Sequence, residues 1–226
     1  MIKLSVIIPV FNERQTIGQI LDEVKKVELE KEIIVVDDGS TDGTRKILKE
    51  LNDPTVKVLY HSENRGKGGA IKTAQTQVSG DVVIIQDADL EYRPEDYPKL
   101  MKPIEDGFAD VVYGSRFLGP HRVFMFWHYA GNKFLTWLTN ILYNTMLTDM
   151  ETGYKVFRAE VFKKLKIRSN RFDFEPEITA KIFKQKLRVV EVPITHYGRG
   201  YKEGKKIGWK DGLVAIWTLI RYRFTE

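Results

Sequence analysis

Two aspartates, Asp87 and Asp89, stand one residue apart directly after an apolar run from Val82 to Ile85. If that run is a buried strand that continues through the pair, its alternation points both side chains to the same side. Carboxylate oxygens suit Mg2+ or Mn2+, which keep further positions for water and substrate phosphates. The spacing therefore predicts a small divalent-metal clamp for a phosphate-bearing substrate. The alternative is an acidic pair that only ends a loop, because so short a motif is not specific.

Composition narrows the class of protein. The chain has 226 residues, 42% of them hydrophobic and 12% aromatic, which is enough for one substantial core. It has no cysteine, which excludes disulfides and thiolate chemistry, and its four scattered histidines do not resemble a zinc site. The net charge of +5 suits anionic partners such as nucleotides or phospholipids. The sequence contains no uncharged apolar stretch of about 18 residues, so we predict no membrane-spanning helix.

The first half of the chain alternates between two hydrophobic patterns. Short apolar runs predict strands at residues 4–9, 33–36, 56–60, 82–85 and 110–113. Helical spacing predicts helices near residues 17–24, 47–51 and 70–78. Thr16 and Gln19 suggest a capping box for the first helix. Such repeated units predict an α/β fold with a mostly parallel sheet and right-handed crossovers.

Polar clusters follow three of these predicted strands, and ligands in parallel sheets bind beyond the carboxyl ends of the strands. We therefore expect the clusters to meet at one edge. They are Asn12 and Glu13, Asp37 and Asp38, and the Asp87–Asp89 pair. A glycine-rich segment, 64–69, opens the third helix, whose N–H groups and Lys67 suit a phosphate. The alternative for residues 37–40 and 64–69 is ordinary turn and cap chemistry.

The second half has a different character. Segment 122–147 is rich in aromatic and large apolar residues, and it predicts either a core helix packed on the sheet or a helix at a membrane interface. Basic residues with interleaved glycines crowd segment 181–210, which predicts either a solvated face or a loop that meets phosphate. The tail 217–224 is an apolar helix end with basic residues, suited to the core or to anionic lipid.

Four ordered motifs resemble family 2 glycosyltransferases of the GT-A fold: residues 6–13, 35–44, 64–68 and 87–89. Within that family the chain is most similar to the branch that makes dolichyl- or polyprenyl-phosphate mannose and glucose. The segments that carry this similarity are 114–116, 149–155, 174–177 and the basic loop near 196–206. The resemblance covers nearly the whole chain. It implies a Rossmann-like, mostly parallel sheet flanked by helices, with amphipathic helices in the second half.

The resemblance also implies a nucleotide-sugar site and a metal site. The metal, Mg2+ or Mn2+, would be held by Asp87 and Asp89, with Glu91 assisting. An aspartate accepts N–H groups of either uracil or guanine, so the base is left open. The residues implied for the nucleotide sugar are Pro9, Asn12, Glu13, Asp37, Asp38, Lys67, Asp87 and Ala88.

On the acceptor side, the resemblance implies Arg116, Arg199 and Lys202 as the cations that receive a lipid phosphate. Arg116 and Asp149 are the implied catalytic residues. Asp149 has two possible roles, because a lipid phosphate is already an anion and needs little proton removal, whereas a sugar hydroxyl acceptor needs a base. Asp149 therefore acts either as a positioning residue or as a base, depending on the acceptor.

We expect an inverting, metal-dependent transferase that moves a hexose from GDP-mannose or UDP-glucose to a polyprenyl or dolichyl phosphate. One GT-A domain would span 1–226, with a nucleotide-sugar half at 1–115 and an acceptor half at 116–226 whose segment 122–147 meets lipid. The enzyme would lie at the cytoplasmic face of a membrane and bind no nucleic acid. The alternatives are a glycosyltransferase with a soluble or glycan hydroxyl acceptor, or a non-catalytic nucleotide-sugar-binding module. The absence of glycine after the first strand argues against a nucleotidyltransferase or a dehydrogenase.

Overall fold

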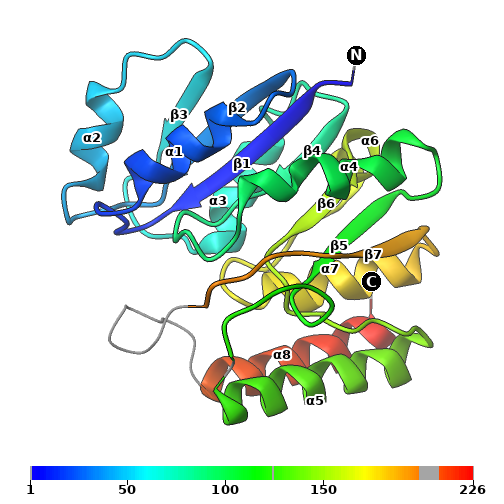
Figure 1. Ribbon diagram of the computed structural model, residues 1–226. Coiled ribbons are helices and arrows are strands. Elements are labelled where there is room, and N and C mark those ends of the chain that lie inside the picture. The colour runs from blue at the N-terminus through cyan, green and yellow to red at the C-terminus, as the bar shows by residue number, and fades with distance from the viewer. Residues whose placement is uncertain (1, 124, 199–208, 226) are drawn as a thin grey trace.

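The computed structural model describes residues 2–123, 125–198 and 209–225. Within these ranges one seven-stranded sheet forms the centre of the molecule (Figure 1). Its strands are β1 (Leu4–Val10), β2 (Lys31–Asp37), β3 (Val56–Tyr60), β4 (Val82–Ile85), β5 (Val111–Ser115), β6 (Lys155–Arg158) and β7 (Val189–Pro193). The order across the sheet is β3-β2-β1-β4-β6-β5-β7.

The sheet is mostly parallel, which confirms the predicted fold class. Strand β6 is antiparallel to both of its neighbours, β4 and β5, whereas the other pairs are parallel. The five predicted strands are confirmed, with ends that differ by at most two residues. The sequence did not predict β6 and β7. Strand β6 has only four residues, with no long apolar run, so its pairing depends on the neighbours that the fold supplies.

Helices cover both faces of the sheet. The helices are α1 (Ile17–Lys26), α2 (Thr44–Glu50), α3 (Lys67–Gln75), the 3-10 turn η1 (Pro94–Asp96), α4 (Tyr97–Glu105), α5 (Phe126–Tyr143), α6 (Ala159–Lys164), α7 (Phe174–Lys184) and α8 (Trp209–Phe224). Apolar residues of α1, α2 and α4 share one core cluster with the sheet, and those of α3, α6 and α7 share the other. Helices α5 and α8 lie side by side beyond α7 and form an outer layer (Figure 1).

The predicted capping box at the start of α1 is wrong. The hydroxyl of Thr16 donates to the side chain of Glu13 at 3.0 Å instead of capping the helix. The side-chain amide of Gln19 donates to Glu23 at 2.9 Å, one turn further along the helix. Both side chains therefore bond to a neighbouring glutamate, which the spacing alone does not exclude.

The strand argument for the Asp87–Asp89 pair is also wrong in detail. Strand β4 ends at Ile85, so the two aspartates lie in the turn that follows and not in the strand. Ala88 between them is buried, at 4% exposed, while both aspartates are half-buried. The turn therefore buries the small apolar residue and leaves both carboxylates closer to the surface.

Candidate active site

The carboxyl ends of β1, β2 and β4 meet at one edge of the sheet, as predicted. These three strands are neighbours and parallel, so the segments that follow them are brought together. The segment after β1 bonds directly to the turn after β2: Asn12 N–H donates to Ser40 Oγ at 3.0 Å, and Thr41 N–H donates to Asn12 Oδ1 at 2.8 Å. We call the side chains gathered here the strand-end cluster; they are Asp37, Asp38, Lys67, Asp87 and Asp89.

Asp37 and Asp38 are buried and bonded within the protein. Asp38 accepts the N–H groups of Arg65 at 2.8 Å and Gly66 at 2.7 Å, and its Oδ1 lies 2.6 Å from Nδ1 of His61. Asp37 pairs with Arg45 and accepts the N–H of Ser40. Asp38 thus fixes the glycine-rich segment before α3 to the end of β2. Their nucleotide role stays a prediction, and their contacts already give both a structural role.

Lys67, the first residue of α3, lies between two carboxylates. Its Nζ is 2.8 Å from Oδ1 of Asp87 and 3.1 Å from Oε1 of Glu175 in α7. Burial lowers the pKa of Lys67, but the charges of Asp87 and Glu175 outweigh that effect and raise it overall. Glu175 also pairs with Lys155, whose side chain is fully buried. A line of alternating charges therefore connects Asp87 to Lys155.

Asp87 and Asp89 supply the carboxylate oxygens that a hard divalent ion prefers. Mg2+ is commonly held by one or two carboxylates together with substrate phosphates. Among the described residues, no group of three His, Cys, Asp or Glu side chains is arranged to hold a metal. Asp87 is already paired with Lys67, so the role of the two aspartates as metal ligands stays a prediction.

Gly153 lets a second-half loop approach Asp87 closely. A Cβ atom at position 153 would lie 2.5 Å from Asp87 Oδ2 and 3.1 Å from the ring of Tyr92. The N–H of Gly153 donates to the hydroxyl of Tyr92 at 2.8 Å, which fixes this approach. The loop that carries Asp149 at one end therefore touches the strand-end cluster at the other.

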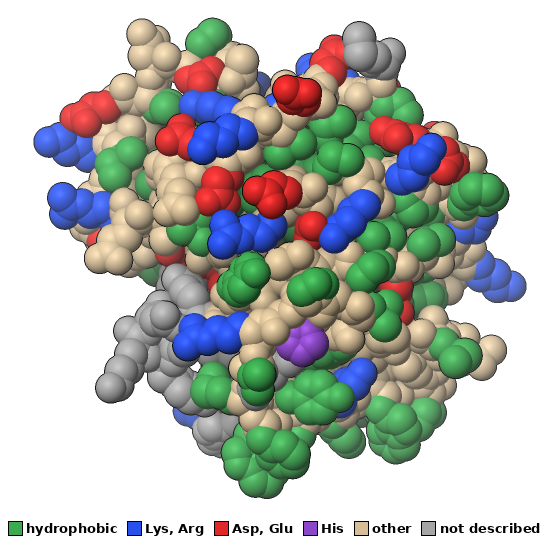
Figure 2. Space-filling view, in the orientation of Figure 1, with side chains coloured by type: hydrophobic (Ala, Val, Ile, Leu, Met, Phe, Trp, Pro, Cys, Tyr) green, Lys and Arg blue, Asp and Glu red, His purple; other side chains and the backbone are tan. Residues whose placement is uncertain are grey.

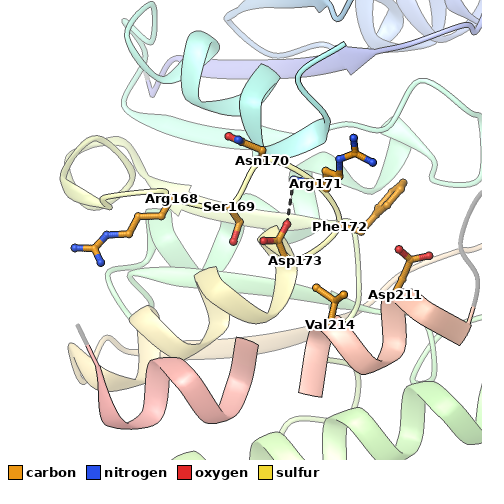
Figure 3. A pocket seen from close by; sticks show the side chains of 8 residues that line it. All are labelled: Arg168, Ser169, Asn170, Arg171, Phe172, Asp173, Asp211 and Val214. Atoms are coloured by element: carbon orange, nitrogen blue, oxygen red, sulfur yellow. Dashed lines mark hydrogen bonds between the residues drawn. The ribbon is translucent and has the colours of Figure 1, made fainter. Parts of the chain in front are cut away.

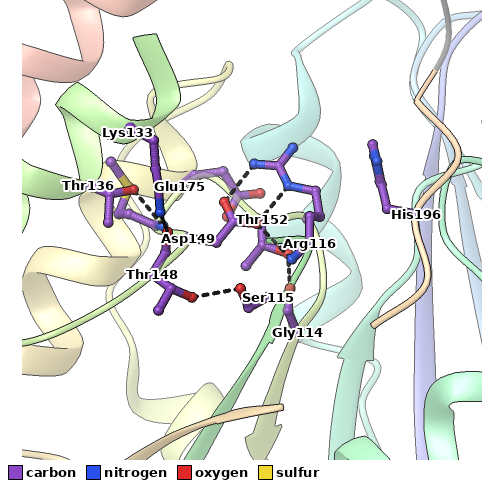
Figure 4. Close-up of polar contacts among 12 residues, drawn as sticks. Gly114, Ser115, Arg116, Lys133, Thr136, Thr148, Asp149, Thr152, Glu175 and His196 are labelled. Carbon is purple, nitrogen blue, oxygen red and sulfur yellow. Dashed lines mark hydrogen bonds and ion pairs between the residues drawn. The ribbon is translucent and has the colours of Figure 1, made fainter. Parts of the chain in front are cut away.

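Arg116, just beyond β5, forms a two-pronged ion pair with Asp149 (Figure 4). Its Nε and Nη2 each lie 2.7 Å from a carboxylate oxygen, and its backbone N–H donates to Asp149 at 3.0 Å. Burial raises the pKa of Asp149, but the charge and hydrogen bonds of Arg116 lower it below its ordinary value. An ionised, fully bonded carboxylate is a poor proton acceptor, so the geometry favours Asp149 as the residue that positions Arg116.

The loop that holds Asp149 is attached to α5. Asn140 accepts the N–H of Leu147 at 2.9 Å, Lys133 donates to the carbonyl of Thr148 at 3.3 Å, and Thr136 accepts the N–H of Met150 at 3.1 Å. Three turns of α5 therefore hold the loop segment 147–150 from one side. We call the charged side chains around the Arg116–Asp149 ion pair the Arg116 cluster; they are Arg116, Asp149, Glu151, Lys155 and Glu175.

Helix α5 also exposes aromatic residues. Trp127 is 81% exposed and Trp137 58% exposed, whereas Leu135 is buried. Helix α8 adds further exposed apolar side chains, among them Leu213 and Trp217. Figure 2 shows hydrophobic side chains gathered at this end of the molecule, where Figure 1 places α5 and α8. Of the two alternatives for segment 122–147, a helix packed mainly on the sheet does not hold: α5 packs mainly on α7 and α8, and Leu135 joins the core cluster. The lipid contact stays a prediction.

The remaining predicted residues lie in different places. Pro9 is half-buried within β1, and the backbone N–H of Glu13 donates to Thr44 Oγ1 at 3.0 Å. Glu91, predicted as an assisting metal ligand, lies 3.2 Å from Nε2 of His196. Arg199 and Lys202 lie outside the described residues. The roles of all these residues stay predictions.

No role is predicted from the sequence for Glu151, Lys155 and Glu175, although all three stand in segments that carry the family resemblance. The signal was a charged residue flanked by apolar ones, as at Lys155 before Val156 and Phe157. Charges of this kind are buried only when they are paired. The pairing partner, however, comes from an element about 20 residues away in the sequence, and only the fold identifies it.

A separate cavity of about 360 Å3 lies between the loop 168–173 and α8 (Figure 3). Phe172 and Asp173 of the loop face Asp211 and Val214 of α8 across it. Among the described residues, none of those predicted for the site lines this cavity. No residue of the strand-end cluster or of the Arg116 cluster lines it either.

Comparison with known proteins assigns these motifs to a family. The family model described as "Glycosyl transferase family 2" matches residues 5–166. The chain is 30% identical to the undecaprenyl-phosphate mannosyltransferase of Micrococcus luteus, with 98% of each chain covered. It is also 30% identical to the UDP-N-acetylglucosamine–dolichyl-phosphate N-acetylglucosaminyltransferase of Methanococcus voltae, with 92% of each chain covered. Three other curated relatives are longer, and the chain spans between 51% and 62% of their length.

Solved structures support the same fold. Glucosyl-3-phosphoglycerate synthase from Mycobacterium tuberculosis, crystallised with Mn2+, UDP and phosphoglyceric acid, matches with a TM-score of 0.74. The match covers 100% of this chain and 80% of that one at 20% sequence identity. This likeness confirms the predicted GT-A fold. Within the described ranges, no helix is long and apolar enough to cross a membrane.

Proposed function

Because the chain belongs to glycosyl transferase family 2, it is a glycosyltransferase, and we propose that it transfers a hexose from a nucleoside-diphosphate sugar to a polyprenyl phosphate at a membrane surface. The relatives named above act on undecaprenyl and dolichyl phosphates according to their names. Their names also show two different sugars, mannose and N-acetylglucosamine. The donor sugar and base of this chain therefore stay open.

One observation carries the proposal: the loop that contains Asp149 is hydrogen-bonded to α5, the helix that exposes Trp127 and Trp137. Trp and Tyr side chains are favoured at the boundary between water and lipid headgroups. A polyprenyl phosphate has its chain in the membrane and its phosphate at that boundary. Helix α5 can therefore rest on lipid while the loop attached to it holds Arg116 for the phosphate.

On the donor side, the strand-end cluster would bind the nucleoside diphosphate. Asp87 and Asp89 are the residues that would hold Mg2+ or Mn2+, with the diphosphate completing its oxygen shell. When bound, the ion neutralises charge on the leaving diphosphate. Lys67, which is paired with Asp87 and Glu175, lies where it can add a further positive charge beside the same group.

On the acceptor side, Arg116 would receive the acceptor phosphate. Asp149 accepts hydrogen bonds from Nε and one terminal nitrogen of the Arg116 guanidinium, which fixes the plane of that group. The other terminal nitrogen of Arg116 can then donate to a phosphate oxygen. The acceptor phosphate is an anion at neutral pH and needs no base before it attacks the anomeric carbon. The bonded state of Asp149 is consistent with that chemistry, since no proton has to move to it.

The proposal is tested by a screen of donors. The purified protein is incubated with Mn2+, a polyprenyl phosphate and either UDP-glucose, UDP-N-acetylglucosamine or GDP-mannose, and lipid-linked sugar is measured. We expect one donor to give a lipid product, and the Asp89→Ala variant to give far less of it. Transfer from these donors to a soluble sugar, with no lipid product, would contradict the acceptor class. Binding of UDP or GDP with no transfer to any acceptor would favour a non-catalytic binding module.

A further inference from the structure

Glu151 is a carboxyl group in the Arg116 cluster that the proposed mechanism does not use. Its side chain is half-buried, and its Oε1 is enclosed by protein without a hydrogen-bond partner among the described residues. Buried polar atoms in native proteins nearly always have a partner, and an exception calls for an explanation. A ligand that supplies the missing hydrogen bond is such an explanation.

The position of Glu151 in its loop is informative. It stands two residues after Asp149, which holds Arg116, and two residues before Gly153, whose backbone touches Asp87. The charged groups that act on it are Glu175, Lys155, Arg116 and Asp149. Glu175 and Lys155 belong to the chain of ion pairs that reaches Lys67 and Asp87, and Asp149 pairs with Arg116. Glu151 therefore lies between the proposed diphosphate side and the proposed acceptor side.

In the proposed reaction the transferred hexose lies in the same region. In a single displacement, the anomeric carbon lies between the leaving diphosphate and the attacking phosphate, so the sugar ring lies between Asp87 and Arg116. We propose that the carboxyl group of Glu151 hydrogen-bonds a hydroxyl of the transferred hexose and so contributes to the choice of donor sugar. This inference rests on the proposed function, and it adds a residue that recognises the sugar.

The charge state of Glu151 suits this role. Burial and the neighbouring charge of Glu175 raise the pKa of Glu151 to about 7, against the opposing effects of Lys155 and Arg116. A neutral carboxyl group both donates and accepts a hydrogen bond, as a sugar hydroxyl does. In its neutral form it also adds no negative charge beside the two phosphates. A glutamine side chain has the same shape and a similar donor and acceptor pair.

The experiment compares the affinity for a nucleotide with the affinity for the nucleotide sugar. Dissociation constants are measured by calorimetry with Mn2+ for UDP against UDP-glucose, and for GDP against GDP-mannose, in the wild type, Glu151→Ala and Glu151→Gln. In Glu151→Ala we expect the nucleotide-sugar affinity to fall about tenfold while the nucleotide affinity is unchanged. Glu151→Gln should restore most of the loss. Thermal unfolding checks that each variant is folded.

Deoxy-sugar analogues of the accepted donor identify the hydroxyl. The analogue that lacks the partner hydroxyl should bind the wild type about tenfold more weakly, yet bind Glu151→Ala as well as the complete donor does. An equal loss for nucleotide and nucleotide sugar in Glu151→Ala would overturn the inference in favour of a structural role. If the wild type transfers sugar while both variants keep its affinity ratio, only this inference fails. If no nucleotide or nucleotide sugar binds the wild type, the proposed function itself fails.

Discussion

The strand-end cluster and the Arg116 cluster are held in place by different parts of the fold. The strand-end cluster lies at the ends of parallel strands, and its carboxylates bond to segments that follow those same strands, as Asp38 does with the N–H groups of Arg65 and Gly66. Arg116 follows a strand too, but its partner Asp149 lies in a loop that α5 holds through Lys133, Thr136 and Asn140. One site edge is therefore part of the sheet, and the other is attached to an outer helix.

The difference fits the two ligands that we propose for the two sides of the site. A nucleotide is a rigid, water-soluble ligand, and the edge of a sheet can be formed in advance for it. A lipid phosphate approaches from a membrane, and the helix that supports its proposed site exposes Trp127 and Trp137. Substitutions at the sheet edge should therefore change folding or donor binding, and substitutions on α5 should change only the use of a lipid acceptor.

The largest expected effect comes from removing a carboxylate beside the diphosphate. The loss of a residue that only orients a metal ligand lowers metal affinity or activity by about 10- to 100-fold. Loss of a ligand itself should have a larger effect, so Asp89→Ala should lower turnover on the order of a thousandfold. Thermal unfolding should be unchanged, since Asp89 is only half-buried. The control is Asp106→Ala, at the end of α4 and away from both clusters. Wild-type turnover in Asp89→Ala, with metal still required, would contradict the assignment of the site.

The Arg116 side is tested by Asp149→Asn. The amide cannot hold the guanidinium in its two-pronged pair, and a misplaced catalytic group costs about a hundredfold in rate. We therefore expect turnover to fall by about that factor, while the dissociation constant for UDP or GDP stays as in the wild type. Weaker nucleotide binding would show that the two clusters are not separate in function.

The same variant has a pH signature. The pKa of Asp149 is depressed in the folded protein because of Arg116, so its stabilising effect is complete above the ordinary value of 3.8 and is lost as pH falls through the lower folded value. The difference in unfolding free energy between wild type and Asp149→Asn should be about 3 kcal/mol at neutral pH and should shrink below pH 3.8. Urea unfolding at several pH values measures it, and a difference that does not change with pH would contradict the ion pair.

A structural role for the strand-end cluster is tested by Asp38→Ala. The change leaves the N–H donors of Arg65 and Gly66 without the carboxylate that accepts from them, so the free energy of unfolding should fall by about 3 kcal/mol. The control is Lys46→Ala on nearby α2, which removes one exposed ion pair with Glu50 and should change stability by less than about 0.5 kcal/mol. Equal effects of the two substitutions, measured by urea unfolding, would show that Asp38 does not fix the loop.

The smallest expected effect comes from the exposed face of α5. Replacing Trp127 and Trp137 with serine should lower transfer to a long-chain polyprenyl phosphate in vesicles by about tenfold, since the two rings supply much of the interfacial area. Transfer to a short, water-soluble prenyl phosphate and the stability of the fold should stay the same. The control is Phe108→Ser, because Phe108 is 71% exposed but lies outside α5 and α8. An equal loss with both acceptors would contradict a role in lipid contact.

The sequence predicted the first half of the fold well because local signals agree there. Each predicted strand is a short apolar run, and in parallel strands buried on both faces that pattern is direct evidence of burial. The positions of Asp38 and Asp87 at one edge follow from the parallel order. Their contacts do not, since the partners of Asp38 come from beyond the next strand.

In the second half, local patterns were ambiguous. The aromatic segment 122–147 has the composition of either a core helix or an interfacial one, because periodicity does not distinguish protein from lipid as the neighbour of an apolar face. The structure shows that α7 and α8 cover only one side of α5. The exposed side is therefore a consequence of how three helices pack, which no single segment encodes.

The sequence by itself determined the family, the parallel sheet and the acidic residues at its carboxyl edge, because motifs and hydrophobic runs are local properties of the chain. The tertiary structure decided how those residues are paired: Asp149 with Arg116, and Lys67 with Asp87 and Glu175. It also encloses an oxygen of Glu151 that has no partner among the residues the structure describes. Charges inside a protein are stable only beside particular partners at short distance. Those distances depend on elements far apart in the sequence, and only the folded chain sets them.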